Sequence, residues 1–211
     1  MEMNSPAPQA VVFDLGKVLL DFDYSRTARA LAPLSDVGPE ELRLALDQSP
    51  LLVRFETGEI TAREMYAEVV RRSGFRGAYA QFAAAFADIF TEIPAMIALH
   101  TDLRERGVPT YIFSNTNEVA VDHIWRNYPF FRTFTGHVYS HQARCMKPQS
   151  MIYDAVEQLS GRRGAELLYI DDRADNIAAG AARQWQVVHH VSVPATVATV
   201  RTAFRLPALS A

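Results

Sequence analysis

Five short apolar segments alternate with helical patterns along the 211-residue chain, and this alternation limits the fold more than any other feature. The segments cover residues 10–14, 109–115, 136–141, 166–172 and 185–190. They are too short for core helices and are rich in Val, Ile, Tyr and Phe, which is typical of buried strands. Helical patterns lie near residues 93–107, 117–127, 149–160, 174–184 and 194–205. The alternation predicts an α/β fold, a Rossmann-like three-layer core whose parallel sheet is covered by helices on both faces.

One long interval interrupts this alternation. Residues 22–93 contain no segment that we expect to form a strand, and the stretches 39–49, 61–74 and 78–90 have helical patterns. Thr61 and Glu64 match a capping box at the start of the second stretch. We therefore expect an α/β core formed by residues 1–21 and 94–211, with residues 22–93 inserted as a helical domain.

Polar side chains follow the predicted strands at the edge where parallel strands bind ligands. They are Asp14, Ser114, Asn115, Asp171 and Asp172, with Lys147 in the nearby segment "MKP". Carboxylates that meet at one edge repel unless a lysine or a hard divalent metal ion neutralises them, and Mg²⁺ prefers such oxygen ligands. A serine hydroxyl and an ammonium group suit phosphate oxygens, and a strand-end aspartate can act as a nucleophile. The residues alone therefore suggest metal-assisted phosphoryl transfer.

Four segments in order carry a family resemblance: "FDLGKVL" (13–19), "IFSNT" (112–116), "MKP" (146–148) and "YIDDRADN" (169–176). Together they resemble the motifs of the haloacid dehalogenase (HAD) superfamily, in its phosphatase branch with a helical cap after the first strand. Within that branch the chain looks similar to small bacterial phosphatases that act on α-D-glucose 1-phosphate. The resemblance implies an enzyme that hydrolyses a phosphoric monoester.

The resemblance also implies a metal site that binds Mg²⁺. Asp14 would be the nucleophile, with its other oxygen on the metal. Gly16 would contribute its backbone carbonyl and Asp172 a carboxylate oxygen. Asp171 and Asn176 would lie behind these ligands and orient them.

The remaining motif residues would bind the phosphate. Ser114 would hold the phosphoryl oxygens together with the Asn115 N–H group, and either residue could also cap the following helix. Lys147 would balance the charge of Asp14 and the phosphate. Asp175 is better explained as an acidic residue in the first turn of a helix.

Gly16 departs from the family pattern. Most phosphatases of this superfamily have a second Asp two residues after the nucleophile, and it protonates the leaving oxygen. Without it, we expect substrates with a weakly basic leaving oxygen, such as an anomeric sugar phosphate. Asp21 or Asp23 could substitute, but we interpret both as linker or helix-capping residues. Similarly, we interpret "RFETGEIT" (54–61) as a turn between helices, with Arg54 and Glu56 as secondary candidates for substrate contact.

Three functions remain open from the sequence. The first is a Mg²⁺-dependent phosphatase for a small phosphorylated metabolite, most simply a sugar phosphate. The second is a 2-haloacid dehalogenase. Such enzymes use the strand-end Asp without a metal ion and lack the paired acids of the fourth motif, so Asp171 and Asp172 argue against this function. The third is a non-catalytic metabolite-binding member of the family, because Gly16 replaces the usual acid.

Composition argues against several partners. The net charge of −3 gives no electrostatic reason to expect nucleic acid or an anionic membrane as a partner. The single cysteine excludes an intrachain disulfide, residues 1–10 show no secretory signal, and no apolar run reaches the length of a membrane span. We therefore expect a cytoplasmic enzyme with no obligate protein partner.

Overall fold

The computed structural model describes residues 7–47 and 49–206. Its central sheet has five parallel strands in the order β5-β4-β1-β6-β7. Their bounds are β1 Ala10–Phe13, β4 Thr110–Ser114, β5 Gly136–Tyr139, β6 Leu167–Asp171 and β7 Gln186–His189. All five lie inside the segments predicted from the sequence. The predicted α/β fold with a parallel sheet is therefore confirmed.

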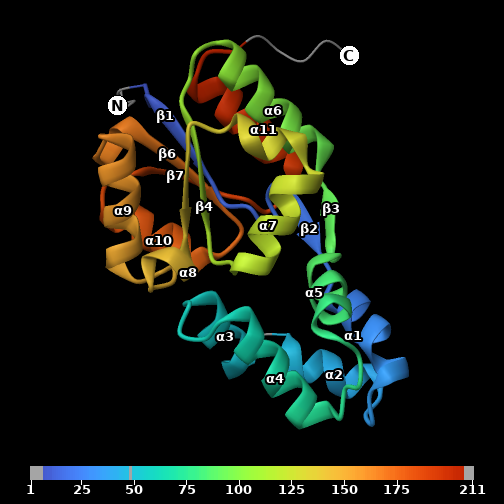
Figure 1. Cartoon of the computed structure of the whole chain (residues 1–211). Coiled ribbons are helices and arrows are strands. Elements are labelled where there is room, and N and C mark those ends of the chain that lie inside the picture. Colours follow the sequence, from blue (N-terminus) through green and yellow to red (C-terminus); the bar gives the residue numbers. More distant parts are fainter. Residues whose placement is uncertain (1–6, 48, 207–211) are drawn as a thin grey trace.

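Helices cover both faces of this sheet (Figure 1). Helices α6 (Pro94–Glu105), α7 (Glu118–Asn127) and α11 (Val193–Ala203) pack on one face, and α9 (Ser150–Ser160) and α10 (Ala174–Ala182) pack on the other. Three short 3₁₀ segments, Ala32–Leu34, Pro129–Thr133 and Gly164–Glu166, complete the connections. The apolar side chains of β1 point alternately into these two layers: Val11 and Phe13 into one, Ala10 and Val12 into the other. Burial on both faces explains why the strands read as continuous apolar runs.

The strand predicted over residues 136–141 ends early. It stops at Tyr139, and the short helix α8 (Ser140–Ala143) follows. The hydroxyl of Ser140 accepts a hydrogen bond from the Thr116 N–H at 2.8 Å, which ties the start of this helix to the loop after β4. The chain therefore leaves the sheet two residues sooner than its apolar pattern indicates.

Five helices gather beyond the carboxyl ends of the strands (Figure 1). They are α1 (Tyr24–Leu31), α2 (Pro39–Leu46), α3 (Pro50–Glu56), α4 (Ala62–Ser73) and α5 (Tyr79–Ala87), and we call them the cap. The cap has its own apolar cluster, in which Phe55, Phe82 and Phe86 are buried. The predicted capping box of Thr61 and Glu64 is present at the start of α4. We propose that residues 22–93 form this cap as a domain inserted into the core.

Two short strands that the sequence did not predict lie where the chain passes between core and cap. β2 (Leu20–Phe22) and β3 (Phe90–Glu92) pair antiparallel, with Phe22 opposite Phe90. The expectation that residues 22–93 contain no strand is therefore wrong at Phe90–Glu92. Each strand has only three residues, too few for a periodic pattern, and the pairing joins segments far apart in the sequence. Both connections to the cap consequently run side by side in one ribbon.

Candidate active site

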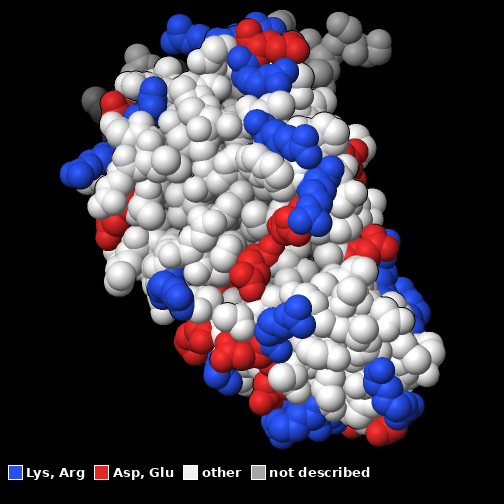
Figure 2. Space-filling view, in the orientation of Figure 1, with Lys and Arg blue, Asp and Glu red and all other residues white. Residues whose placement is uncertain are grey.

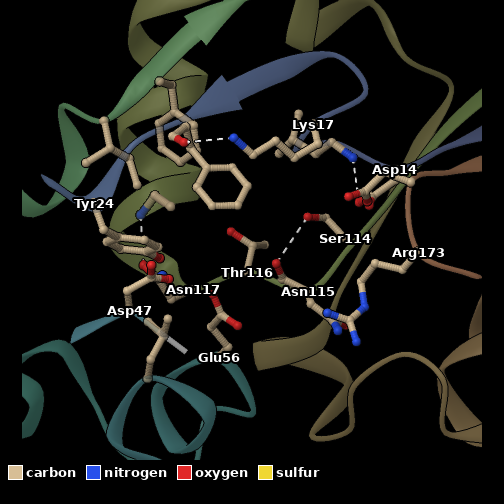
Figure 3. Close-up of a pocket in the computed structure, with 18 of the residues that line it drawn as sticks. Asp14, Lys17, Tyr24, Asp47, Glu56, Ser114, Asn115, Thr116, Asn117 and Arg173 are labelled. Carbon is tan, nitrogen blue, oxygen red and sulfur yellow. Dashed lines mark hydrogen bonds between the residues drawn. The ribbon is translucent and has the colours of Figure 1, made fainter. Parts of the chain in front are cut away.

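A cavity of about 620 Å³ lies between the cap and the carboxyl ends of the strands (Figure 3). Six residues predicted for the site line it: Asp14, Gly16, Ser114, Asn115, Lys147 and Asp172. Asn176 also lines this cavity, whereas Asp171 lies behind it and is fully buried. The structure therefore brings the four sequence motifs together in one place.

Lys147 lies at the centre of the buried charges. Its Nζ atom is 2.9 Å from Asp14 Oδ1 and 2.7 Å from Asp171 Oδ2, and it donates to the Phe113 carbonyl at 2.9 Å. Burial by itself lowers the pKa of Lys147, but the two carboxylates outweigh it and the net pKa is raised. The ammonium group therefore keeps its charge and joins Asp14, which follows β1, to Asp171 at the end of β6.

Asp14 stands immediately after β1. Its backbone N–H donates to the Ile170 carbonyl at 2.9 Å, and its Oδ1 atom accepts from the Leu15 N–H at 2.7 Å. Burial raises the pKa of Asp14 well above its ordinary value; Lys147 opposes this shift, and the nearby acids Asp171 and Asp172 add to it. One lysine does not fully compensate the negative charge gathered here.

Asp171 accepts hydrogen bonds on both carboxylate oxygens. The donors are Lys147 Nζ, the Tyr169 hydroxyl, the Arg173 N–H at 2.9 Å, and Asn176 Nδ2 at 3.0 and 3.2 Å. Burial raises the pKa of Asp171, but Lys147, the Tyr169 hydroxyl and the Arg173 N–H together lower it by more, so that the net shift is downward. Asp171 is thus a fixed anion that holds Lys147 in place.

Asp172 differs from its neighbour. Its carboxylate is half-buried and has no hydrogen bond or ion pair with another residue of the described ranges. One carboxylate oxygen each of Asp14, Asp171 and Asp172 lies within 4.8 Å of the others. In addition, Asn176 Oδ1 is buried without a hydrogen-bond partner in the described part of the chain. The carboxylates of Asp14 and Asp172 are oxygen donors of the kind that a hard dication such as Mg²⁺ takes, and the unsatisfied Asn176 Oδ1 lies behind them.

The loop after β4 is braced against the loop of Lys147. The Asn115 side chain accepts from the Lys147 N–H at 2.8 Å and donates to the Lys147 carbonyl at 3.1 Å. Ser114, at the end of β4, is buried and lines the cavity. The sequence did not indicate this use of the Asn115 side chain. It also did not show that Asn117 caps α7, by accepting from the Ala120 N–H at 3.0 Å, in place of Ser114 or Asn115.

The two carboxylates that follow Gly16 in the sequence, Asp21 and Asp23, already have partners. Asp21 pairs with Lys17, and Asp23 caps α1 by accepting from the Ser25 N–H at 2.8 Å. These contacts agree with their interpretation as linker and capping residues. Asp175 pairs with Arg173 in the first turn of α10, also as expected.

A model of the haloacid dehalogenase-like hydrolase family matches residues 8–182, a span that holds all four motifs and the cap. The chain belongs to this family. It is therefore a hydrolase, and the relationship suggested by the four motifs is confirmed.

Several proteins of known sequence or structure resemble this chain. The sesquiterpene phosphatase astK of Aspergillus oryzae is 24% identical over 177 residues, which cover 82% of this chain and 85% of that protein. The HAD family enzyme bt-2542 of Bacteroides thetaiotaomicron, solved with magnesium and inorganic phosphate, superposes with a TM-score of 0.76 at 21% identity, covering 86% of this chain and 93% of that one. The L-2-haloacid dehalogenase of Xanthobacter autotrophicus superposes with a TM-score of 0.64 at 22% identity, covering 89% and 80%. The structural likeness extends to both phosphate-binding and dehalogenating members and establishes the fold.

The visible surface shows no concentration of one charge. On the face in Figure 2, Lys and Arg side chains lie among Asp and Glu side chains over both the core and the cap. Within residues 7–47 and 49–206, no helix combines the length and apolar character needed to cross a bilayer.

Proposed function

We propose that this HAD-like hydrolase is a Mg²⁺-dependent phosphatase that acts on a small phosphorylated metabolite, specifically a sugar phosphate such as glucose 1-phosphate. The observation that carries the proposal is the arrangement around Lys147, which lies 2.9 Å from Asp14 and 2.7 Å from Asp171 in the wall of a cavity that Ser114 and Asp172 also line. One nucleophile, one fixed cation, one hydroxyl and one free carboxylate are the groups that phosphoryl transfer requires.

The donor set fits a magnesium ion. Asp14, the Gly16 carbonyl and Asp172 would hold it, and Asp171 and Asn176 would orient these ligands from behind. When bound, the ion would neutralise charge on the phosphate oxygens, so that an anionic nucleophile could approach the phosphorus atom.

The protein's own side chains would bind the phosphoryl group and carry out its transfer. Lys147 and Ser114 would bind the phosphoryl oxygens and hold phosphorus in line with Asp14. An Asp14 oxygen forms a bond to phosphorus as the ester P–O bond breaks, and the leaving oxygen departs with the bonding electron pair and takes a proton from solvent. Water then attacks phosphorus and gives up a proton to solvent as the P–O bond to Asp14 breaks, which releases inorganic phosphate and restores the Asp14 carboxylate. The cap would exclude bulk water during these steps.

The glycine at position 16 bears on the choice of substrate. With no carboxyl group there to protonate the leaving oxygen, the general-acid contribution of roughly 10²- to 10⁴-fold is missing. An anomeric leaving oxygen is less basic than a simple alkoxide, because the ring oxygen withdraws electrons from it. This favours a sugar 1-phosphate over an ordinary alkyl phosphate.

The dehalogenase alternative would also use Asp14 but would require no metal. The free carboxylate of Asp172 and the unsatisfied Asn176 Oδ1 have no role in that reaction. Chloride release from a 2-haloacid in the presence of EDTA would favour the dehalogenase over the phosphatase.

The test is phosphate release from a panel of metabolite phosphates with and without Mg²⁺. We expect release only with Mg²⁺, loss of release on adding EDTA, and no turnover by Asp14→Asn. Full activity of Asp14→Asn, or of the wild type in EDTA, would contradict the proposal.

A further inference from the structure

Glu56 is a polar group of the cap that the proposed chemistry does not use. It is the last residue of α3, it is partly buried, and it lines the same cavity as Asp14. Figure 3 shows its side chain extending from the cap toward the space beside Thr116 and Asn117. No hydrogen bond or ion pair joins its carboxyl group to another residue among those the structure describes. Burial raises the pKa of Glu56 to about 8, so at neutral pH the group carries a proton and can both donate and accept.

Two further polar groups face this part of the cavity. Burial, followed by the nearby carboxyl groups of Glu56 and Asp47, raises the pKa of Tyr24 well above its ordinary value. Tyr24 and Asp47 both line the cavity, and Asp47 Oδ2 is 3.6 Å from Arg43 Nη1. A hydrocarbon leaving group would cover these groups without satisfying their hydrogen bonds, which is costly. These polar groups stand among apolar lining residues such as Leu52, Val53 and Ile89, and they offer hydrogen-bonding partners to a leaving group that carries hydroxyls.

The backbone of Glu56 is fixed to the phosphate-binding side of the site. Its carbonyl oxygen lies 2.5 Å from the Ser140 hydroxyl, and this hydroxyl also accepts from the Thr116 N–H at 2.8 Å. Two residues later, Gly58 has φ 68° and packs so closely that an added Cβ would stand 2.4 Å from the His141 carbonyl oxygen. Arg144 donates to the Gly58 carbonyl. The turn that carries Glu56 is thus docked on α8, at a fixed distance from the loop that follows Ser114.

We propose that Glu56 determines substrate specificity by hydrogen-bonding a hydroxyl of the leaving group, so that the cavity selects polyhydroxylated phosphate esters over hydrocarbon esters. This inference rests on the proposed phosphatase function, because it concerns the alcohol half of the ester. It does not require Glu56 to take part in the bond-breaking step.

The test compares two kinds of ester. The first is a panel of hexose and pentose phosphates that includes α-D-glucose 1-phosphate. The second is p-nitrophenyl phosphate, whose leaving group has no additional hydroxyl. We expect Glu56→Ala to lower kcat/KM for the best sugar phosphate by roughly tenfold. This is the loss expected when one hydrogen bond at the strong end of the usual range is removed. For p-nitrophenyl phosphate the same variant should stay within about threefold of the wild type.

Three further variants sharpen this comparison. Glu56→Gln keeps a donor and an acceptor at the same reach and should retain most activity on sugar phosphates, whereas Glu56→Asp is one methylene shorter and should lose it as Glu56→Ala does. Glu59→Ala is the matched control, because it removes an exposed carboxyl group from the same turn that does not line the cavity. It should leave both kinds of ester unaffected. If Glu56→Ala does not fold, as judged by circular dichroism, Glu56→Asp on the same two kinds of ester gives the answer.

Failure of the role of Glu56 can be distinguished from failure of the proposed phosphatase function. An equal loss on both kinds of ester, or no loss on either, would overturn the role of Glu56 while leaving the phosphatase intact. A wild-type preference for p-nitrophenyl phosphate over every sugar phosphate would also overturn it. Absence of phosphate release from any ester would remove the proposed function, and this inference with it.

Discussion

The aromatic ring of Phe22 occupies the space into which a side chain at position 16 would point: a Cβ on Gly16 would stand 2.9 Å from a ring carbon of Phe22. Phe22 lies in the ribbon that joins core and cap, opposite Phe90. The missing carboxyl group is therefore replaced by a packed aromatic ring rather than by open space. The connection to the cap and the loss of the usual acid belong to one structural feature.

Restoring an acid at this position should consequently fail. We expect Gly16→Asp to displace the Phe22 ring and lower the free energy of unfolding by about 1–3 kcal/mol, the usual cost of overpacking. Activity should fall rather than rise. Urea unfolding and phosphate release measure the two effects.

Gly38 offers a matched control for this substitution. A Cβ there would meet nothing within 4 Å, and Gly38 is the N-cap of α2, where Asp is favourable. Gly38→Asp should therefore leave the free energy of unfolding unchanged or raise it. A Gly16→Asp variant that is as stable as the wild type and more active would refute the argument from Phe22.

Removing the central cation should cost stability as well as activity. In Lys147→Met the carboxylates of Asp14 and Asp171 would remain buried without their partner, and breaking a buried ion pair costs roughly 3–5 kcal/mol. Urea unfolding measures the loss. The chain's other lysine is the control: Lys17 pairs with Asp21 on the surface, so Lys17→Met should change the free energy of unfolding by less than about 1 kcal/mol. Equal effects of the two substitutions would contradict the account of Lys147.

Magnesium should stabilise the folded protein through Asp172. A ligand that binds only the folded state at a hundredfold excess over its Kd adds about 2.7 kcal/mol, which raises the melting temperature. Asp172→Asn should abolish this rise and the phosphate release. Asp175→Asn is the control. Asp175 lies three residues after Asp172 and pairs with Arg173 at the surface, so this variant should keep the rise in melting temperature. If magnesium stabilises Asp172→Asn as much as the wild type, the ion binds elsewhere.

The carboxyl group of Glu56 should make stability depend on pH. Its pKa is about 8 in the folded chain, against an ordinary value of 4.5. Between these values the folded state holds a proton that the unfolded state has released, so the free energy of unfolding falls as pH rises from about 4.5 to about 8. Glu56→Gln lacks this proton, and its stability relative to the wild type should rise across that window. Glu59→Gln serves as control, and a constant difference between Glu56→Gln and wild type at every pH would show that Glu56 does not carry the effect.

The sheet could be predicted from the sequence because its strands are buried on both faces and so appear as uninterrupted apolar runs. The ribbon of β2 and β3 could not, because its strands are defined by the pairing of Phe22 with Phe90 and not by a local pattern. The early end of β5 likewise depends on a tertiary hydrogen bond, from the Thr116 N–H to the Ser140 hydroxyl.

The motifs placed the site residues in one cavity, but they did not reveal how each is used. Asp171 and Asp172 are adjacent and chemically identical, yet only the structure shows that the oxygens of Asp171 are taken up by Lys147, Tyr169 and other donors. Glu56 and Glu59 also look alike in the sequence. Glu56 lines the cavity and is partly buried, whereas Glu59 is exposed and does not line it, and no local pattern encodes this difference.

We expect Asp14 to accept the phosphoryl group, and trapping the phosphorylated intermediate shows whether it does. Because no carboxyl group at position 16 activates the attacking water, the aspartyl-phosphate should accumulate during turnover. Acid-quenched reactions with p-nitrophenyl phosphate and Mg²⁺, followed by peptide mass spectrometry, should show one phosphoryl group on Asp14 of the wild type and none in Asp14→Asn. Undiminished phosphate release by Asp14→Asn, or a phosphoryl group found on another residue, would contradict the account.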